Sequence, residues 1–192
     1  MFFIPGILIS AVTFPGVIVH ELAHQVFCYF RRVPVYEVKY FQLQTPCGYV
    51  LHEPSDNPLT NFVIAMGPFL VNTLLGAIIL LPASVEMMEF GLLGALSGEN
   101  AAWNVLHYLP TLLSIWLGLS IVMHAFPSTG DAGSLVDSIL KNKRVNPFIK
   151  ILVAPFVGLI YLGAIGSVFW LDFGYALLVA FSLPKLIALF IQ

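Results

Sequence analysis

Two histidines and a glutamate lie close together near the start of the chain, in the pentapeptide that runs from His20 through Glu21 to His24. Residues four apart on a helix lie one above the other on the same face, so the two imidazoles can bind one zinc ion. Glu21 lies one step around that helix and can accept a proton from a water molecule on the ion. The spacing therefore predicts a zinc site with His20 and His24 as ligands and Glu21 as the catalytic residue.

The apolar setting of these side chains favours a metal. They lie in an apolar stretch at about 2–30, and an unpaired charge in a membrane helix costs about 2.5 kcal/mol or more. One Zn²⁺ ion, two neutral imidazoles, one carboxylate ligand and an ionised Glu21 sum to a formal charge of zero. We therefore expect one zinc ion per chain, and the alternative is a metal-free polar contact between helices.

A catalytic zinc site needs a third protein ligand, and Asp131 is the strongest candidate. It follows Pro127 and Gly130, which break the helical pattern, so its carboxylate can turn back toward the two histidines. The ordinary alternative is that Asp131 only caps the short helix that follows it. Glu37 and Glu53 are the alternative third ligands, as in a membrane zinc protease of another family.

The composition of the chain is that of a protein surrounded by lipid. Of its 192 residues, 59% are hydrophobic and 9% are charged, whereas a soluble domain carries about 25% charged residues. Eight Lys and Arg and a net charge of -2 leave no basic patch for a phosphate backbone. We therefore expect the lipid bilayer as a partner and no nucleic acid.

Five apolar segments are long enough to cross a bilayer. They lie at about 2–30, 59–83, 105–126, 148–170 and 173–191. Their connections are too short for another domain of ordinary size, so residues 1–192 are expected to form a single membrane domain. The sequence predicts an all-α polytopic membrane protein with about five transmembrane helices.

The basic residues predict how these helices are oriented. Two connections, 31–58 and 127–147, hold most of the Lys and Arg, and the connection at 84–104 holds glutamates and no basic residue. Asp172 marks the other turn on the same side as 84–104. By the positive-inside rule, 31–58, 127–147 and the C-terminus are cytoplasmic, and the N-terminus is outside. Asp131 and the end of the first segment then share a side, so the site opens to the cytoplasm.

The connection after the first segment differs in composition and pattern from the apolar segments. Residues 33–53 are rich in Val, Tyr and Phe and are interrupted near Pro46 and Gly48, which predicts a small β-hairpin at the cytoplasmic face. After Asp131, Leu135 and Ile139 recur at helical spacing, which predicts a short interfacial helix.

These motifs together resemble the site-2 protease family of intramembrane metalloproteases. Beyond the His-Glu-x-x-His helix and the aspartate in a Pro- and Gly-containing loop, Cys47-Gly48-Tyr49-Val50 is similar to the Gly-Gly-Tyr-Val of that family. The segment 65–68 followed by Asn72 is similar to its Ala-Gly-Pro-x-x-Asn helix, although one more residue separates Pro68 from Asn72 here. The resemblance covers about 14–135; the expected catalytic core is about 10–135, with two extra transmembrane helices over about 148–191.

The resemblance implies a minimal prokaryotic-type member, a multi-pass zinc metalloprotease of the cell membrane, with Asp131 as third ligand. Its implied substrate is a membrane protein whose transmembrane segment must unwind locally, because a helix hides its peptide bonds. Gly48, Tyr49 and Val50 would then bind the extended substrate by edge pairing. Asn72 would hydrogen-bond the substrate backbone, or it makes an ordinary contact between helices.

One hypothesis outside enzymes also fits the sequence. A catalytically silent relative, a membrane scaffold that keeps the fold and the metal, would retain His20, His24 and Asp131. Such a protein has no need for the carboxylate of Glu21, so the intact glutamate favours the protease.

Overall fold

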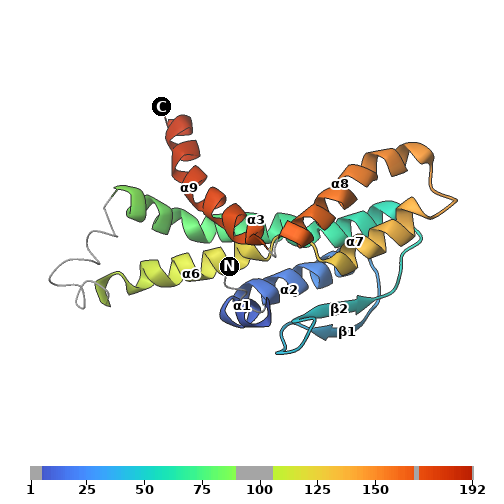
Figure 1. Cartoon of the computed structure of the whole chain (residues 1–192), viewed down its shortest axis with the longest axis horizontal. Coiled ribbons are helices and arrows are strands. Elements are labelled where there is room, and N and C mark those ends of the chain that lie inside the picture. The colour runs from blue at the N-terminus through green and yellow to red at the C-terminus, as the bar shows by residue number, and fades with distance from the viewer. Residues whose placement is uncertain (1–5, 90–105, 167–168, 192) are drawn as a thin grey trace.

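The computed structural model describes residues 6–89, 106–166 and 169–191. Its elements, in chain order, are α1 (Gly6–Val12), α2 (Phe14–Phe30), β1 (Val35–Lys39), β2 (Tyr49–His52), α3 (Pro58–Glu89), α6 (Leu109–Met123), α7 (Thr129–Leu135), the π-helical turn η1 (Val136–Leu140), α8 (Pro147–Gly166) and α9 (Leu171–Ile191) (Figure 1). The chain is mostly helical with one small antiparallel sheet, and to that extent the predicted fold class is confirmed.

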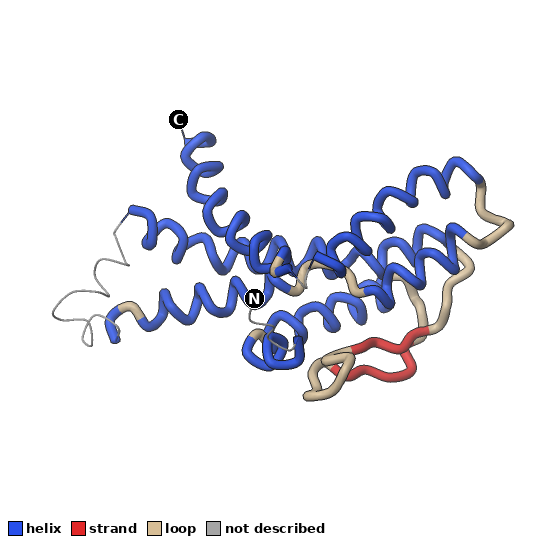
Figure 2. The backbone as a smooth tube through the Cα atoms, viewed as in Figure 1, coloured by secondary structure: helices blue, strands red, loops and turns tan. Residues whose placement is uncertain are grey.

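The predicted β-hairpin is present between α2 and α3. β1 and β2 pair antiparallel, with Val38 opposite Val50 and Lys39 opposite Tyr49. β-branched and aromatic side chains favour this extended pairing. Figure 2 shows the two strands to one side of the helices, near the end of the molecule where α3 begins.

Fewer helices than the five expected are long and apolar enough to cross a membrane. Among the described residues, one helix qualifies, Pro58–Glu86 within α3, with 29 residues and a mean hydropathy of 2.2. At 1.5 Å per residue it is about 43 Å long, against a hydrocarbon core of about 30 Å. α1 and α2 qualify only as one span bent by 89°. The apolar parts of α6 and α8 are shorter, so about five such helices are not found.

Long α3 is the axis along which the later helices pack. α6 and then α7 with η1 follow it in one direction, and α8 and then α9 follow it in the other (Figure 1). One core cluster joins α3, α7, η1 and α8, and it contains Ala65, Ala132, Leu135, Ile139, Val153, Val157 and Ile160. A second joins α3, α6 and α9, and it contains Leu80, Val122, Met123, Ala176, Val179 and Ala180.

This packing changes the expected path of the C-terminal segments. The sequence predicted a turn near Asp172 that returns the chain to the hairpin side of the membrane. Instead, α9 continues along α3 past α8 and runs away from the hairpin (Figure 1). The predicted short helix after Asp131 is present as α7 and η1, and its apolar side chains are buried against α3 and α8.

Candidate metal centre

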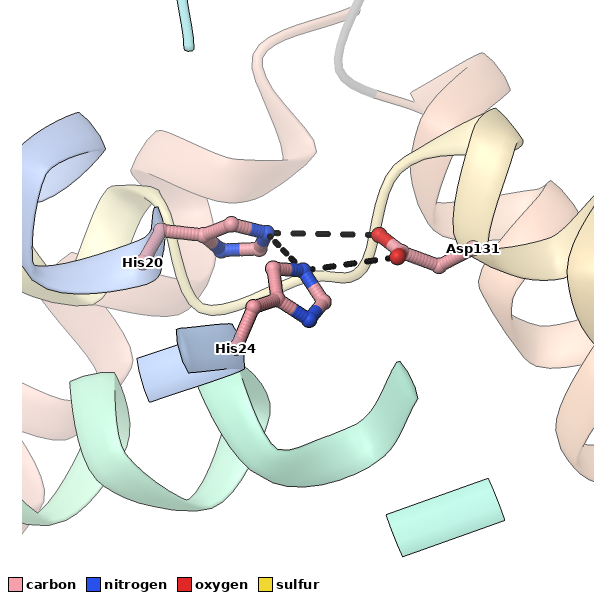
Figure 3. A group of neighbouring side chains, drawn as sticks. All are labelled: His20, His24 and Asp131. Carbon is pink, nitrogen blue, oxygen red and sulfur yellow. Dashed lines mark hydrogen bonds and ion pairs between the residues drawn. The ribbon is translucent and has the colours of Figure 1, made fainter. Parts of the chain in front are cut away.

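Two helices bring the predicted ligands together at mid-molecule. α2 presents His20 and His24, which are buried, and the first turn of α7 presents Asp131. The side chains point toward one another (Figure 3), with 3.2 Å between the two Nε2 atoms and 3.3 Å from His24 Nε2 to Asp131 Oδ1. One ligand atom from each residue lies within 4.8 Å of the others. The structure therefore contains a candidate metal-binding cluster of the three residues that the sequence predicted.

Backbone carbonyls fix which imidazole nitrogens carry hydrogen. His20 Nδ1 lies 2.7 Å from the carbonyl oxygen of His124, and His24 Nδ1 lies 2.9 Å from that of Ile64. A carbonyl oxygen only accepts, so both Nδ1 atoms donate, and in the neutral rings both Nε2 atoms carry lone pairs. Two lone pairs and a carboxylate facing one another at these distances repel unless a metal ion, or a proton on one of the rings, lies between them.

The spacing of the ligand atoms fits zinc. Ligands 2.0–2.1 Å from a tetrahedral zinc ion lie about 3.3 Å apart, close to the 3.2 and 3.3 Å found here. The third separation, 4.0 Å from His20 Nε2 to Asp131 Oδ2, involves the carboxylate oxygen that is turned toward Ser128. Imidazole donors whose other nitrogen binds a carbonyl are the usual arrangement around zinc.

Asp131 is held in place by its own helix start. Ser128 caps α7, and both its backbone N–H and its hydroxyl donate to Asp131 Oδ2 at 2.7 Å. Oδ1 stays directed at His24. Ser128, and not Asp131 as in the capping alternative, is therefore the N-cap of α7, and Asp131 completes the capping box through Oδ2 while Oδ1 is free to face the histidines.

Glu21 lies in the wall of a cavity beside this cluster. The cavity has a volume of about 450 Å³, and Glu21 and His20 line it together with residues 46–48 of the hairpin loop. Gly48 lies directly over the glutamate: a Cβ atom there would stand 2.7 Å from Glu21 Cγ. This close approach explains the glycine, and it places one of the three predicted strand residues against Glu21, the predicted catalytic residue.

The other hairpin residues lie farther from the cluster. Tyr49 and Val50 follow Gly48 in β2, and the Tyr49 hydroxyl donates to the carboxylate of Glu37 at 2.6 Å. Glu37 and Glu53 are exposed on the hairpin and are not members of the metal-binding cluster. The geometry therefore favours Asp131 over either glutamate as the third ligand.

Asn72 makes the contact between helices that was one of its two predicted roles. It is fully buried, and its Nδ2 is 3.2, 3.1 and 3.0 Å from the carbonyl oxygens of Gly16, Ile121 and His124. These contacts join α3 to α2 and α6, as the interhelical alternative expected. Binding of a substrate by Asn72 stays a prediction, but its amide hydrogens are already engaged by the fold.

Two features of the site were missed in the sequence. Asp172, at the start of α9, lines the same cavity as Glu21, although it was expected on the opposite side of the membrane. The only sequence signal was a lone carboxylate between two apolar segments.

The second missed feature is a set of side-chain contacts that hold the loop between α6 and α7 in place. The ring of Phe126 in that loop lies 5.0 Å from the ring of Tyr175 in α9 and 5.8 Å from that of Phe69 in α3. The Tyr175 hydroxyl lies 2.9 Å from the hydroxyl oxygen of Thr73 in α3. Because Asp131 follows this loop, α9 helps to position the third ligand.

No protein-family model, curated protein or solved structure matches this chain. The resemblance to site-2 proteases therefore stays a prediction.

Proposed function

We propose that this protein is an intramembrane zinc metalloprotease of the site-2 protease type, which hydrolyses peptide bonds in or near the transmembrane segments of membrane proteins. The observation that carries the proposal is the convergence of two imidazole lone pairs and the Asp131 carboxylate at zinc-like spacing, beside a cavity lined by Glu21. A purely structural zinc site is closed by four protein ligands, whereas a catalytic site keeps an open position. The cluster offers three ligands, which suits catalysis.

A multi-pass position in the membrane belongs to the same proposal. Many large apolar side chains face outward, among them Ile151 at 71% and Leu159 at 62% exposure in α8, and lipid would cover them. The non-helical backbone at 124–128 lines the cavity, and such backbone is tolerated at membrane depth only inside protein or beside water. We infer that α6 with α7 and η1, and α8 with α9, form broken crossings interrupted at the cavity.

The residues of the cavity divide the chemistry between them. When bound, zinc would act as a Lewis acid and lower the pKa of a water molecule toward about 7. Glu21 would accept the proton from that water as it attacks the peptide carbonyl, and would then donate it to the leaving amine. His20 and His24 would hold the metal through Nε2 as neutral imidazoles, with the Nδ1 hydrogen of each donated to a backbone carbonyl.

The hairpin supports the binding of an unwound substrate. Within the described chain, β2 pairs with β1 on one edge only, and the loop before β2 reaches the cavity through Gly48. An extended peptide that pairs with the second edge of β2 would satisfy the backbone groups it loses on unwinding. Gly48, Tyr49 and Val50 would guide it toward Glu21.

The experiment is a comparison of metal content and proteolysis in purified protein. His20→Ala, His24→Ala and Asp131→Ala should each lose most of one bound zinc per chain, and His52→Ala, outside the cluster, should keep it. Glu21→Gln should keep zinc while cleavage of a test transmembrane substrate falls by about 10² to 10⁴. Glu53→Gln, on the exposed hairpin, is the matched control and should cleave normally.

The outcomes separate the competing functions. Zinc without cleavage in the parent protein would replace the protease by a membrane scaffold. Full zinc content and activity in Asp131→Ala would exclude the proposed ligand set. Loss of zinc in Glu21→Gln would make that glutamate a structural ligand.

A further inference from the structure

The cavity beside the candidate metal centre is acidic. Its polar lining side chains are Ser10, His20, Glu21, Cys47, His124, Ser128, Thr129 and Asp172, and no Lys or Arg is among its described lining residues. With a divalent cation held by neutral imidazoles and Asp131, an ionised Glu21 brings the formal charge to zero. The carboxylate of Asp172 then gives the cavity a net charge of about −1, and most of its other lining residues are apolar or uncharged.

Asp172 has acceptor capacity to spare. Its Oδ1 accepts the backbone N–H of Phe173 at 2.9 Å. Among the described residues, no Lys, Arg or His lies within 4.0 Å of its carboxylate. A carboxylate of this kind is costly in an apolar environment unless a cation or a hydrogen-bond donor meets it.

His124 adds a second acceptor to the same wall. Its Nδ1 lies 3.0 Å from the carbonyl oxygen of Ser120 and therefore donates, so in the neutral ring Nε2 is an acceptor. The side chain is held from the other side by α2, because even a Cβ atom on Gly16 would stand 2.6 Å from its Nδ1. The wall formed by the end of α6 and the start of α9 thus offers acceptors, fixed in place.

We propose that Asp172 and His124 form a subsite for a protonated nitrogen of the substrate, an ammonium or guanidinium group next to the scissile peptide bond. The inference rests on the proposed protease function and names the substrate class: transmembrane segments with a Lys or Arg beside the cleavage site. A new α-ammonium group, released on the product by cleavage, has the same chemistry. Acidic residues at that position are repelled.

The first experiment measures cleavage preference with zinc-loaded protein in lipid vesicles. Test substrates differ only in a Lys, Gln or Glu beside the scissile bond. The parent should cleave the Lys substrate at least about tenfold faster than the Glu substrate, since opposite charges a few ångströms apart at a protein surface interact by several kcal/mol. Asp172→Asn should bring the two rates within about twofold, and Asp172→Lys should reverse the preference.

Two control variants separate the effect of losing the Asp172 charge from an effect on folding. Asp137→Asn removes an exposed carboxylate paired with Lys141 on η1 and should leave the preference unchanged. Asp172→Ser removes the charge but keeps a side-chain oxygen for the start of α9, so it tests the subsite even if Asp172→Asn unfolds. A variant without the charge that keeps the parent's full preference for Lys would overturn the proposal and leave Asp172 as a helix-start residue.

Binding measurements distinguish this proposal from the protease function on which it rests. In the Glu21→Gln background, a peptide segment with Lys should bind at least about tenfold more tightly than the same segment with Glu, and Asp172→Asn should abolish the difference. A binding preference without cleavage by the parent would refute the protease and support the subsite. Cleavage without any charge preference would do the reverse. Free and N-acetylated product peptides show whether the α-ammonium is also bound.

Discussion

Replacing Asn72 by alanine tests whether the fold positions the metal ligands as the contacts indicate. The Asn72 amide and the Nδ1–H of His20 share one acceptor, the carbonyl oxygen of His124, at 3.0 and 2.7 Å. The amide has two hydrogens, so it makes at most two good hydrogen bonds to its three neighbouring carbonyls. At about 0.6 to 1.5 kcal/mol each, their loss should lower the free energy of unfolding by about 1 to 3 kcal/mol.

A loss of stability alone would not show that Asn72 positions His20. A change in zinc affinity would show it. Because the His124 carbonyl orients His20, Asn72→Ala should weaken zinc binding by about 10- to 100-fold, as expected for groups that hold a ligand. The assay is competition with a chromophoric chelator, alongside thermal unfolding with and without zinc. Asn61→Ala is the matched control: Asn61 is also buried on α3, but its amide donates to Ser55. Unchanged zinc affinity in Asn72→Ala, or an equal loss in Asn61→Ala, would refute this reasoning.

Two further predictions follow from the fold and the cavity. Gly48→Ala should reduce cleavage by at least about tenfold while zinc content is kept, because the new Cβ would stand 2.7 Å from Glu21 Cγ and displace the general base; unchanged activity would show that the loop does not lie over Glu21 during catalysis. Cysteine reporters at 55–57 and 141–143 should be labelled from one side of the membrane and a reporter at 86 from the other. A reporter in the last turn of α9 should share the side of residue 86, and labelling from the hairpin side would contradict the observed course of α9.

Local patterns were sufficient for the features that depend on neighbours in the chain. The four-residue spacing of His20 and His24 requires only one helix, and the helix-breaking Pro127 allowed Asp131 to be chosen before any packing was known. The hairpin was predictable because residues 33–53 are rich in β-branched and aromatic residues. These features depend on interactions between residues close in the chain, so the sequence alone is enough to predict them.

Features that depend on packing between distant segments were not predictable in the same way. Apolar composition indicates that a segment is buried in protein or lipid, but not whether it crosses a bilayer straight, and the first segment bends by 89° between α1 and α2. The direction of α9 is set by its contacts with α3 and α6. For that reason the sequence placed Asp172 on the side away from the cavity that it lines. It also left open whether Asn72 contacts a substrate or, as found, the backbone carbonyls of neighbouring helices.

The contacts of α9 also show how much of the chain supports the candidate metal centre. The sequence motifs stop near residue 135, which makes α8 and α9 look like additions to a complete core. Yet Tyr175 packs on Phe126 in the loop before Asp131, and a Cβ atom on Gly163 of α8 would stand 3.1 Å from the same ring. The loop before Asp131 is therefore held between α3 and the two C-terminal helices. Because the ligand geometry depends on that loop, α8 and α9 are structurally part of the candidate metal centre, and a chain cut after residue 140 would leave Asp131 without its support.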